Sequence, residues 1–244
     1  MKVRFLSGNA IKIIGAVTMV SDHIGYILFP GVEIFRIIGR IAFPLFAFMI
    51  SEGARYTKNR VRYFLTLLCF GIVCQLPLIA LMNEYHFNIF VTFALSVLGI
   101  YALDNFKRQV LAKERDTVHI LTSLALGLIL LGVIFVLTRC ESFHIDYGFY
   151  GVLLPVFASL PNLSGAEAPD KLARLDCLPV RILCMLIPTV ILAYTMAEIQ
   201  WFSLISLPLL FLYSGKRGQW KMKYFFYVFY PLHMVIIYGI SLFI

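Results

Sequence analysis

Two adjacent stretches decide the fold: LSGNAIKIIGAVTMVSDHIGYILFP at residues 6–30 and IFRIIGRIAFPLFAFMISEG at residues 34–53. Each is apolar over the roughly 20 residues that an α-helix needs to cross the hydrocarbon core of a bilayer. Ser7-Gly8-Asn9, which precedes the first run, is typical of a helix N-terminus. Because the connection between the two runs is short, we expect two antiparallel transmembrane helices that contact each other.

The rest of the chain continues this pattern. Of its residues, 61% are hydrophobic and 14% are charged, whereas a typical soluble domain is about 25% charged. The apolar runs predict transmembrane helices at 9–29, 34–54, 63–82, 88–104, 118–138, 147–160, 179–197, 199–214 and 224–243. We therefore expect an all-α, polytopic bundle of about nine spans that occupies residues 1–244 as a single domain. The loops are too short for a separate catalytic domain, so chemistry must lie between the helices or at their ends.

The formal net charge of +8 follows from membrane topology. Lys12, Arg36 and Arg40 fall inside predicted spans and Arg139 falls in a predicted outer loop. Every other Lys and Arg, including Lys2, Lys221 and Lys223 near the two ends, falls on one side. The positive-inside rule then predicts a cytoplasmic N-terminus and an outer C-terminus in a cell membrane. We therefore expect the helices to be surrounded by membrane lipid, and the positive charge gives no reason to expect a nucleic-acid partner.

The five cysteines contain no CxxC pair. Most of them lie in apolar runs, where a thiol behaves as a small hydrophobic group. We therefore expect neither a disulfide framework nor a metal site.

Ionisable residues inside spans are costly and mark candidate functional sites. Lys12 and His23 fall on one stripe of the first helix, about 16 Å apart along its axis, and Asp22 points about 100° away from them. Asp22 and Arg40 lie at similar depths, which predicts an ion pair. That pair either takes part in function or only neutralises two buried charges. Pro44 leaves the carbonyl of Arg40 without its helical donor, so we expect a kink at Arg40.

Other polar residues recur near helix ends. For Glu52 we expect pairing with the nearby basic loop. Asn88 and Thr92 are expected to form interhelical hydrogen bonds, although with Asp146 they also suggest an outward-facing polar cavity. His233, inside the last predicted span, is either a buried histidine bonded to a backbone carbonyl or a second candidate for catalysis.

Four stretches of the sequence resemble a known protein family. The stretches at 6–30 and 35–53, together with IDYGFYGVLLP at 145–155 and FYVFYPLHMVIIYG at 226–239, resemble the TraX (F-pilin N-acetylase) family of bacterial membrane proteins. Residues 40–53 also distantly resemble the heparan-type transmembrane acetyltransferases. The resemblance implies a multi-pass enzyme that moves an acetyl group from cytoplasmic acetyl-CoA to an amine. It also implies an acceptor in the membrane or on its outer side, either a protein or a small amine-bearing molecule. Gln75 departs from the pattern, because an acidic residue is expected there.

With that activity in view, we assign His23 as the general base, since a neutral imidazole can accept a proton within the membrane. Asp22 orients its neighbours or holds Arg40, and Arg40 stabilises negative charge on the donor or in the transition state. Asp146 and His233 complete the candidate catalytic residues.

Cations are the candidates for binding the acyl donor: Lys12, Arg60 and Arg62 toward the cytoplasmic side, and Arg36 in the second predicted span, which like Arg40 could stabilise negative charge on the donor. The same charged residues inside spans also suit a different class of protein, a transporter with an intramembrane polar path. Movement of a solute without an acyl donor would distinguish that alternative.

Overall fold

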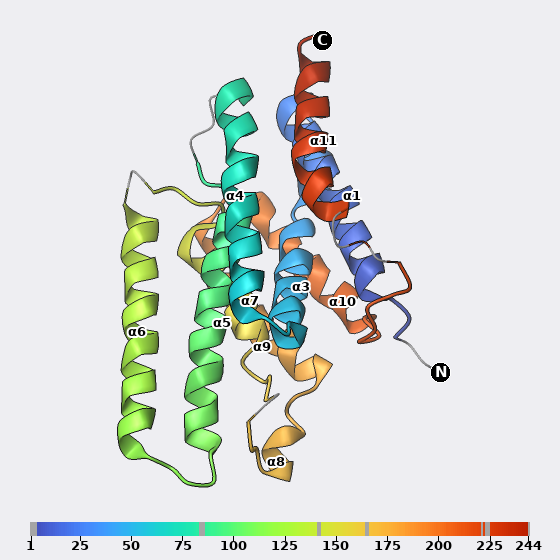
Figure 1. The fold of residues 1–244 in the computed structure, drawn as a ribbon. Coiled ribbons are helices and arrows are strands. Elements are labelled where there is room, and N and C mark those ends of the chain that lie inside the picture. The colour runs from blue at the N-terminus through green and yellow to red at the C-terminus, as the bar shows by residue number, and fades with distance from the viewer. Residues whose placement is uncertain are drawn as a thin grey trace. The chain divides into compact units, whose positions relative to one another are not determined.

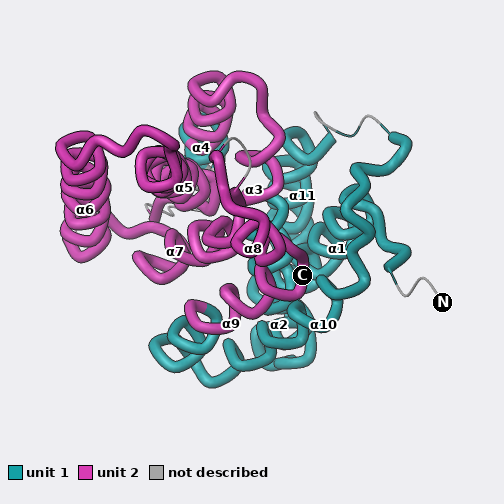
Figure 2. Tube along the Cα trace, turned by 90° about the horizontal axis from the view of Figure 1, so that it is seen from below, with its two compact units in different colours: residues 1–49, 72–85, 189–244 teal, residues 50–71, 86–188 magenta. Residues whose placement is uncertain are grey.

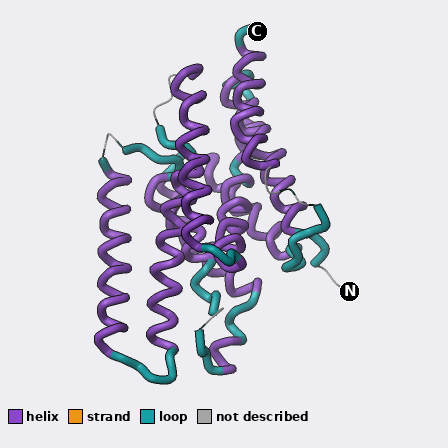
Figure 3. The backbone as a smooth tube through the Cα atoms, viewed as in Figure 1, coloured by secondary structure: helices purple, strands orange, loops and turns teal. Residues whose placement is uncertain are grey.

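The computed structural model describes residues 4–82, 86–140, 143–163, 166–220, 222 and 225–243. All regular secondary structure in these ranges is helical, as Figure 3 shows, and two isolated β-bridges join loop segments. Lys2, Lys221, Lys223 and Ile244 lie outside the described residues, so the structure gives no support for or against the parts of the topology prediction that rest on them.

The predicted apolar runs all form helices, most of which Figure 1 labels. Their bounds are α1 Gly8–Ile27, α2 Glu33–Gly39, α3 Ala42–Tyr56, α4 Arg60–Met82, α5 Ile89–Leu111, α6 Thr117–Arg139, α7 Gly148–Ala158, α8 Asp170–Ala173, α9 Leu178–Thr195, the 3-10 helix η1 Glu198–Ile205, α10 Ser206–Phe211 and α11 Phe225–Ser241. Among the described residues, six segments are long and apolar enough to cross a membrane, with α2 and α3 counted together. The helices α7, η1 with α10, and α11 are apolar but shorter.

The helix predicted at 34–54 is divided in two. α2 ends at Gly39, Arg40 is its C-cap, and α3 begins at Ala42. Pro44 lies in the first turn of α3, where a missing N–H removes the donor for the Arg40 carbonyl. The kink predicted at Arg40 is therefore confirmed.

Two other boundaries differ from the prediction. The span predicted to end at residue 104 continues as α5 to Leu111. The span predicted at 199–214 begins as the 3-10 helix η1 and becomes α-helical only at Ser206. A 3-10 helix has three residues per turn, so every third side chain lies on one face. This property matters for the site described below.

The chain divides into two compact units, coloured separately in Figure 2. The first comprises residues 1–49, 72–85 and 189–244, and the second comprises residues 50–71 and 86–188. In the first unit, α1 packs against α2 and α11, and η1 packs against α2 and α10. In the second unit, α5 packs against α6 and α7, and α6 also contacts α7.

In the first unit, the N-terminal end of α1 is fixed by hydrogen bonds. Ser7 is the N-cap, and its hydroxyl accepts a hydrogen bond from the Ala10 amide at 3.2 Å. The amides of Gly8 and Asn9 donate to the carbonyls of Lys216 and Arg217. These bonds satisfy donors that the first turn of a helix cannot pair internally. The start of α1 is thereby fastened to a loop that carries two cations.

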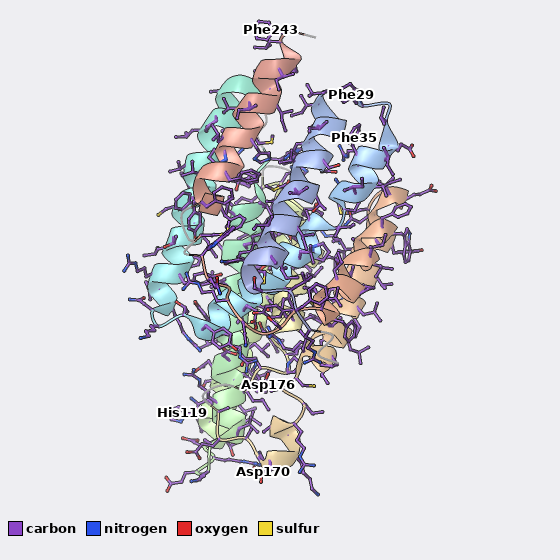
Figure 4. All side chains as sticks on the ribbon, turned by 90° about the vertical axis from the view of Figure 1, so that its right-hand side faces the viewer. Phe29, Phe35, His119, Asp170, Asp176 and Phe243 are labelled. Carbon is purple, nitrogen blue, oxygen red and sulfur yellow. The ribbon has the colours of Figure 1, made fainter. Side chains whose placement is uncertain are left out.

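Small residues bring α1 and α2 close together. A Cβ added at Gly39 would collide with the Asp22 side chain, and one added at Gly25 would crowd Phe35 and Arg36. At the turn between the helices, the Phe29 and Phe35 rings stack with centroids 5.8 Å apart, and Figure 4 labels both. The expected antiparallel contact of these helices is confirmed.

The second unit has an apolar core and a buried ion pair. Val91, Ile134, Ile145 and Val152 form one core cluster, to which α5, α6 and α7 all contribute. Its exposed apolar side chains concentrate on α6, which suits contact with lipid. At the start of α6, the exposed Asp116 caps the helix, and the His119 ring beside it lowers the pKa of the Asp116 carboxyl.

The buried ion pair corrects one prediction. Glu52 forms an ion pair with Arg181 of α9, which is distant in sequence from the basic loop that follows α3, and the two side chains are only 5% and 6% exposed. Arg181 also donates to the Ser51 hydroxyl and to the Ala158 carbonyl. Arg181 lies in the first turn of α9, where burial makes a charged partner necessary.

Candidate active site

Two histidines from opposite ends of the chain meet in the first unit. His23 of α1 and His233 of α11 are joined through Nδ1 of His23 and Nε2 of His233, 2.7 Å apart. Their ring centroids are 4.9 Å apart. His233 is buried, while His23 is partly exposed. Figure 1 shows α1 and α11 side by side, so the packing of these two helices brings the rings together.

The hydrogen bonds fix where the protons lie on this pair. Nδ1 of His233 lies 2.9 Å from the Phe229 carbonyl. A carbonyl only accepts, so Nδ1 of His233 carries the hydrogen and Nε2 of the neutral ring is an acceptor. Nδ1 of His23 must then donate to it. In the neutral pair, Nε2 of His23 is therefore unprotonated, and its lone pair is available to accept a proton.

A charged cluster adjoins His23 along the chain. Asp22 pairs with Arg40, as predicted, and its Oδ1 also lies 3.2 Å from Nε of Arg36. Arg40 is buried, and its Nε donates to the Arg36 carbonyl at 3.3 Å. Arg36 also lies over the Tyr26 ring, 4.9 Å from its centroid. Two guanidinium groups share one carboxylate, so these three side chains carry a net positive charge.

The cluster continues onto the 3-10 helix, where sequence reasoning assigned no site residue. Nη1 of Arg40 donates to Oε1 of Gln200 at 3.3 Å. Gln200, Ser203 and Ser206 recur at every third position of QWFSLIS and are all buried. Their spacing is the signal that prediction missed, because the segment was treated as an α-helix, in which three-residue steps drift around the axis.

Lys12 lies on the same stripe of α1 as His23, toward its N-terminal end. Its Nζ is 5.9 Å from the centroid of the Phe226 ring on α11. Arg217, in the loop fastened to α1, is near enough to interact electrostatically with it. No carboxylate pairs with Lys12 within the part of the chain that the structure describes. The Lys12–His23 stripe predicted from sequence therefore faces α11 at both positions.

The remaining predicted site residues belong to the second unit. Arg60 pairs with Asp104 at 3.1 Å and lies over the Tyr101 ring. Arg62 is exposed in the first turn of α4. The carbonyl of Asp146 accepts a hydrogen bond from Thr92 at 2.8 Å, and the Asn88 side chain donates to the Gly71 carbonyl at 2.7 Å. The hydrogen bond expected between Asn88 and a neighbouring helix is thus confirmed, whereas Thr92 bonds to the loop that precedes α7. Arg60 already has a carboxylate partner.

The structure thus brings together His23 and His233 as one pair, and Asp22, Arg36 and Arg40 as one cluster. Within the described ranges, no group of three or more His, Cys, Asp or Glu side chains is arranged to hold a metal ion.

Comparison with known proteins identifies the family to which this chain belongs. The sequence model of the family described as "TraX protein" matches residues 7–241. The chain belongs to the TraX family. The TraX match includes α1, both halves of the kinked α2–α3 segment and all of α11, so the histidine pair and the arginine cluster both lie within it.

Two relatives resemble this TraX-family chain. A protein of Dichelobacter nodosus named "Probable fimbrial assembly protein FimC, serogroup H1" is 25% identical over 98% of this chain and 97% of its own length. The "Uncharacterized protein RP591" of Rickettsia prowazekii is 32% identical over 40% of this chain and 38% of its own length. No solved structure matches the TraX chain significantly.

Proposed function

We propose that this TraX-family protein is a membrane acetyltransferase that moves an acetyl group from cytoplasmic acetyl-CoA to an amine presented in the membrane or on its outer side. The observation that carries the proposal is the histidine pair, which leaves a lone pair on Nε2 of His23 inside an apolar helix bundle. Family membership and the likeness to a protein named for fimbrial assembly add support. An acceptor amine on a pilus subunit or another envelope protein fits that name.

The reaction needs one proton to move twice. The amine nitrogen attacks the thioester carbonyl carbon, and Nε2 of His23 takes the proton that the nitrogen loses. When the tetrahedral intermediate collapses, the carbon–sulfur bond breaks and the proton passes from Nε2 to the departing thiolate, which gives CoA. His233 accepts the hydrogen bond from Nδ1 of His23 throughout, so it orients the base and stabilises the imidazolium that forms.

The charged groups of the first unit suit the anionic donor. Lys12 lies toward the N-terminal end of α1 without a carboxylate partner among the described residues, and Arg217 is near it. A pair of cations of this kind attracts phosphate groups. Arg60 is a weaker candidate because Asp104 compensates its charge. We therefore assign the CoA phosphates to Lys12 and Arg217, and the net positive charge of the Asp22–Arg36–Arg40 cluster to the acyl end of the donor.

This function requires a particular topology. We propose that the nine apolar helical segments of the described chain are nine membrane passages, with the N-terminus cytoplasmic and the C-terminus outside, in the bacterial inner membrane. This orientation places the start of α1, with Lys12 and Arg217, on the side where acetyl-CoA is present.

A direct assay tests the proposal. The purified protein in detergent or proteoliposomes is incubated with acetyl-CoA labelled in the acetyl group and with a short peptide that has a free N-terminal amine. We expect thioester consumption and labelled peptide, each reduced at least roughly 100-fold in His23→Ala, as is typical of a lost general base. Thioester loss at the same rate in wild type and His23→Ala would reject the proposed chemistry. Movement of a solute without acyl donor would favour the transporter alternative.

A further inference from the structure

The 3-10 helix η1 has its polar face inside and its apolar face outside. Gln200 and Ser203 of η1 and Ser206, which follows it as the first residue of α10, are 1%, 0% and 0% exposed. Trp201 and Ile205, by contrast, are 44% and 47% exposed. Buried polar side chains are normally hydrogen-bonded, and exceptions in a native structure need an explanation. Within a membrane protein, an inward polar face either forms hydrogen bonds to neighbouring helices or lines a site for a ligand.

Two donors on this face have no partner in the part of the chain that the structure describes: Nε2 of Gln200 and Oγ of Ser203. The orientation of the Gln200 amide is fixed by chemistry. Arg40 can only donate, so the atom that faces it must be Oε1, and Nε2 must lie on the other side. Ser206 differs, because its hydroxyl donates to the Ser203 carbonyl at 2.6 Å.

The surroundings of these donors are positively charged. Gln200 is hydrogen-bonded to Arg40, which with Arg36 outnumbers the single carboxylate of Asp22. All of these residues belong to the first unit, in which η1 packs against α2. Unpaired donors beside excess positive charge call for a ligand atom that accepts hydrogen bonds and carries negative charge.

We infer that Gln200 and Ser203, supported by Arg40, form a binding site for the oxygen of a small acyl group. The site accepts a carboxylate oxygen, as in acetate, or the carbonyl oxygen of an acetyl thioester. The assignment of the acetyl thioester as a ligand rests on the proposed function. In that reaction the thioester oxygen becomes an oxyanion when the amine attacks, and it regains its double bond when the thiolate leaves. Donors aimed at this oxygen stabilise the charge as it develops.

Because these donors are buried and unpaired, the inference can be distinguished from a purely structural role by measuring the stability of variants that lack them. Ser203→Ala removes only a donor that has no partner in the described, unliganded protein, so it should preserve or raise the melting temperature without ligand. Gln200→Met removes the unpaired Nε2 donor but also the Oε1 acceptor of Arg40, so it should lower the melting temperature without ligand, and its ligand-induced shift is measured from its own baseline. Ser206→Ala is the matched control, because it changes a buried hydroxyl of the same face that already donates to a carbonyl.

The first arm uses acetate alone and needs no catalysis. We expect sodium acetate to raise the melting temperature of the wild-type protein above its value in sodium chloride of equal ionic strength. The Ser206→Ala variant should retain this shift, and Ser203→Ala and Gln200→Met should lose most of it. Equal effects of acetate and chloride on the wild type, or equal acetate shifts in all four proteins, would overturn the site.

The second arm distinguishes the acetyl thioester from free carboxylate. In the acetyl-CoA assay, Ser203→Ala and Gln200→Met should lower kcat by about 100-fold, the scale of one lost oxyanion donor, with Ser206→Ala close to wild type. An acetate shift with the expected variant pattern but no acetyl-CoA consumption by wild type would retain the site as a carboxylate site and reject the proposed function. If the wild type consumes acetyl-CoA and both variants consume it at the same rate, the assignment of the thioester oxygen to this site is overturned.

Discussion

His23 and His233 illustrate what a single hydrogen bond decides. Nδ1 of His233 is committed to the Phe229 carbonyl, so the tautomer of His23 follows without any further assumption. In the proposed reaction, His233 acts through His23 and is a positioning residue. A substitution that preserves its acceptor should therefore be far milder than one that removes it.

The first prediction compares two variants of His233. His233→Gln supplies a side-chain oxygen that can still accept from Nδ1 of His23, whereas His233→Leu supplies none. We expect the Gln variant to retain acetyl transfer within about 10-fold and the Leu variant to lose about 100-fold or more, toward the effect of losing the base itself. The measurement is kcat with acetyl-CoA, with melting temperature as the control for folding. Equal losses in both would show that His233 must itself carry a proton.

The second prediction concerns Asp22 and Arg40. Asp22→Asn leaves two guanidinium groups without their carboxylate, which should cost about 3–5 kcal/mol of stability. The double variant Asp22→Asn with Arg40→Gln removes both the carboxylate and the buried cation, so it should recover much of that loss. Thermal or denaturant unfolding measures stability, and acetyl-CoA turnover is read in the variant that folds. Turnover near the wild-type rate in a folded double variant would make the pair structural only.

At the scale of elements, α1 and α2 pack at a distance that only glycine permits. The Asp22 side chain occupies the space that a Cβ at Gly39 would need. The α1–α2 contact and the Asp22–Arg40 ion pair are therefore one feature, because close approach of the helices is what brings the carboxylate to the guanidinium groups.

Gly39→Ala tests this coupling, and the third prediction is that it costs about 1–3 kcal/mol through overpacking. Gly239→Ala is the control: Gly239 lies within α11 and has open space around its Cβ position. The control should be neutral or stabilising, because alanine favours a helix over glycine by roughly 0.5–1 kcal/mol. Equal unfolding free energies in the two variants would show that the hairpin tolerates a wider spacing.

Local features of this hairpin were predictable from sequence. The stripe of Lys12 and His23 follows from helix periodicity, and the kink at Arg40 follows from the chemistry of Pro44. Partners distant in the chain were not predictable. His233 is 210 residues from His23, and Arg181 is 129 residues from Glu52. Periodicity fixes which face a residue occupies, but which helix covers that face depends on packing of the whole bundle. The polar face of η1 was missed for a simpler reason, since its helix type was misassigned.

At the scale of the whole molecule, the prediction with the widest consequences is orientation. Lys and Arg concentrate in the predicted cytoplasmic segments, and Arg139 falls in an outer one. The fourth prediction is that reporter fusions at residues 59 and 219 report the cytoplasm and that a fusion after Ile244 reports the outside. A cytoplasmic reporter after Ile244 would mean that one of the shorter apolar helices, such as α7, does not cross.

The hydrogen-bond chain that starts at His23 ends at the Phe229 carbonyl, and this termination determines the electrical character of the proposed reaction. A carbonyl oxygen takes up no proton, so a proton received by His23 has no exit through His233 and must return through Nε2 to the thiolate. The acetyl group is uncharged, and each turnover then moves no net charge across the bilayer. Acetyl transfer in sealed vesicles should therefore run at an unchanged rate when a protonophore collapses the membrane potential. A rate that follows the potential would reveal a second proton path.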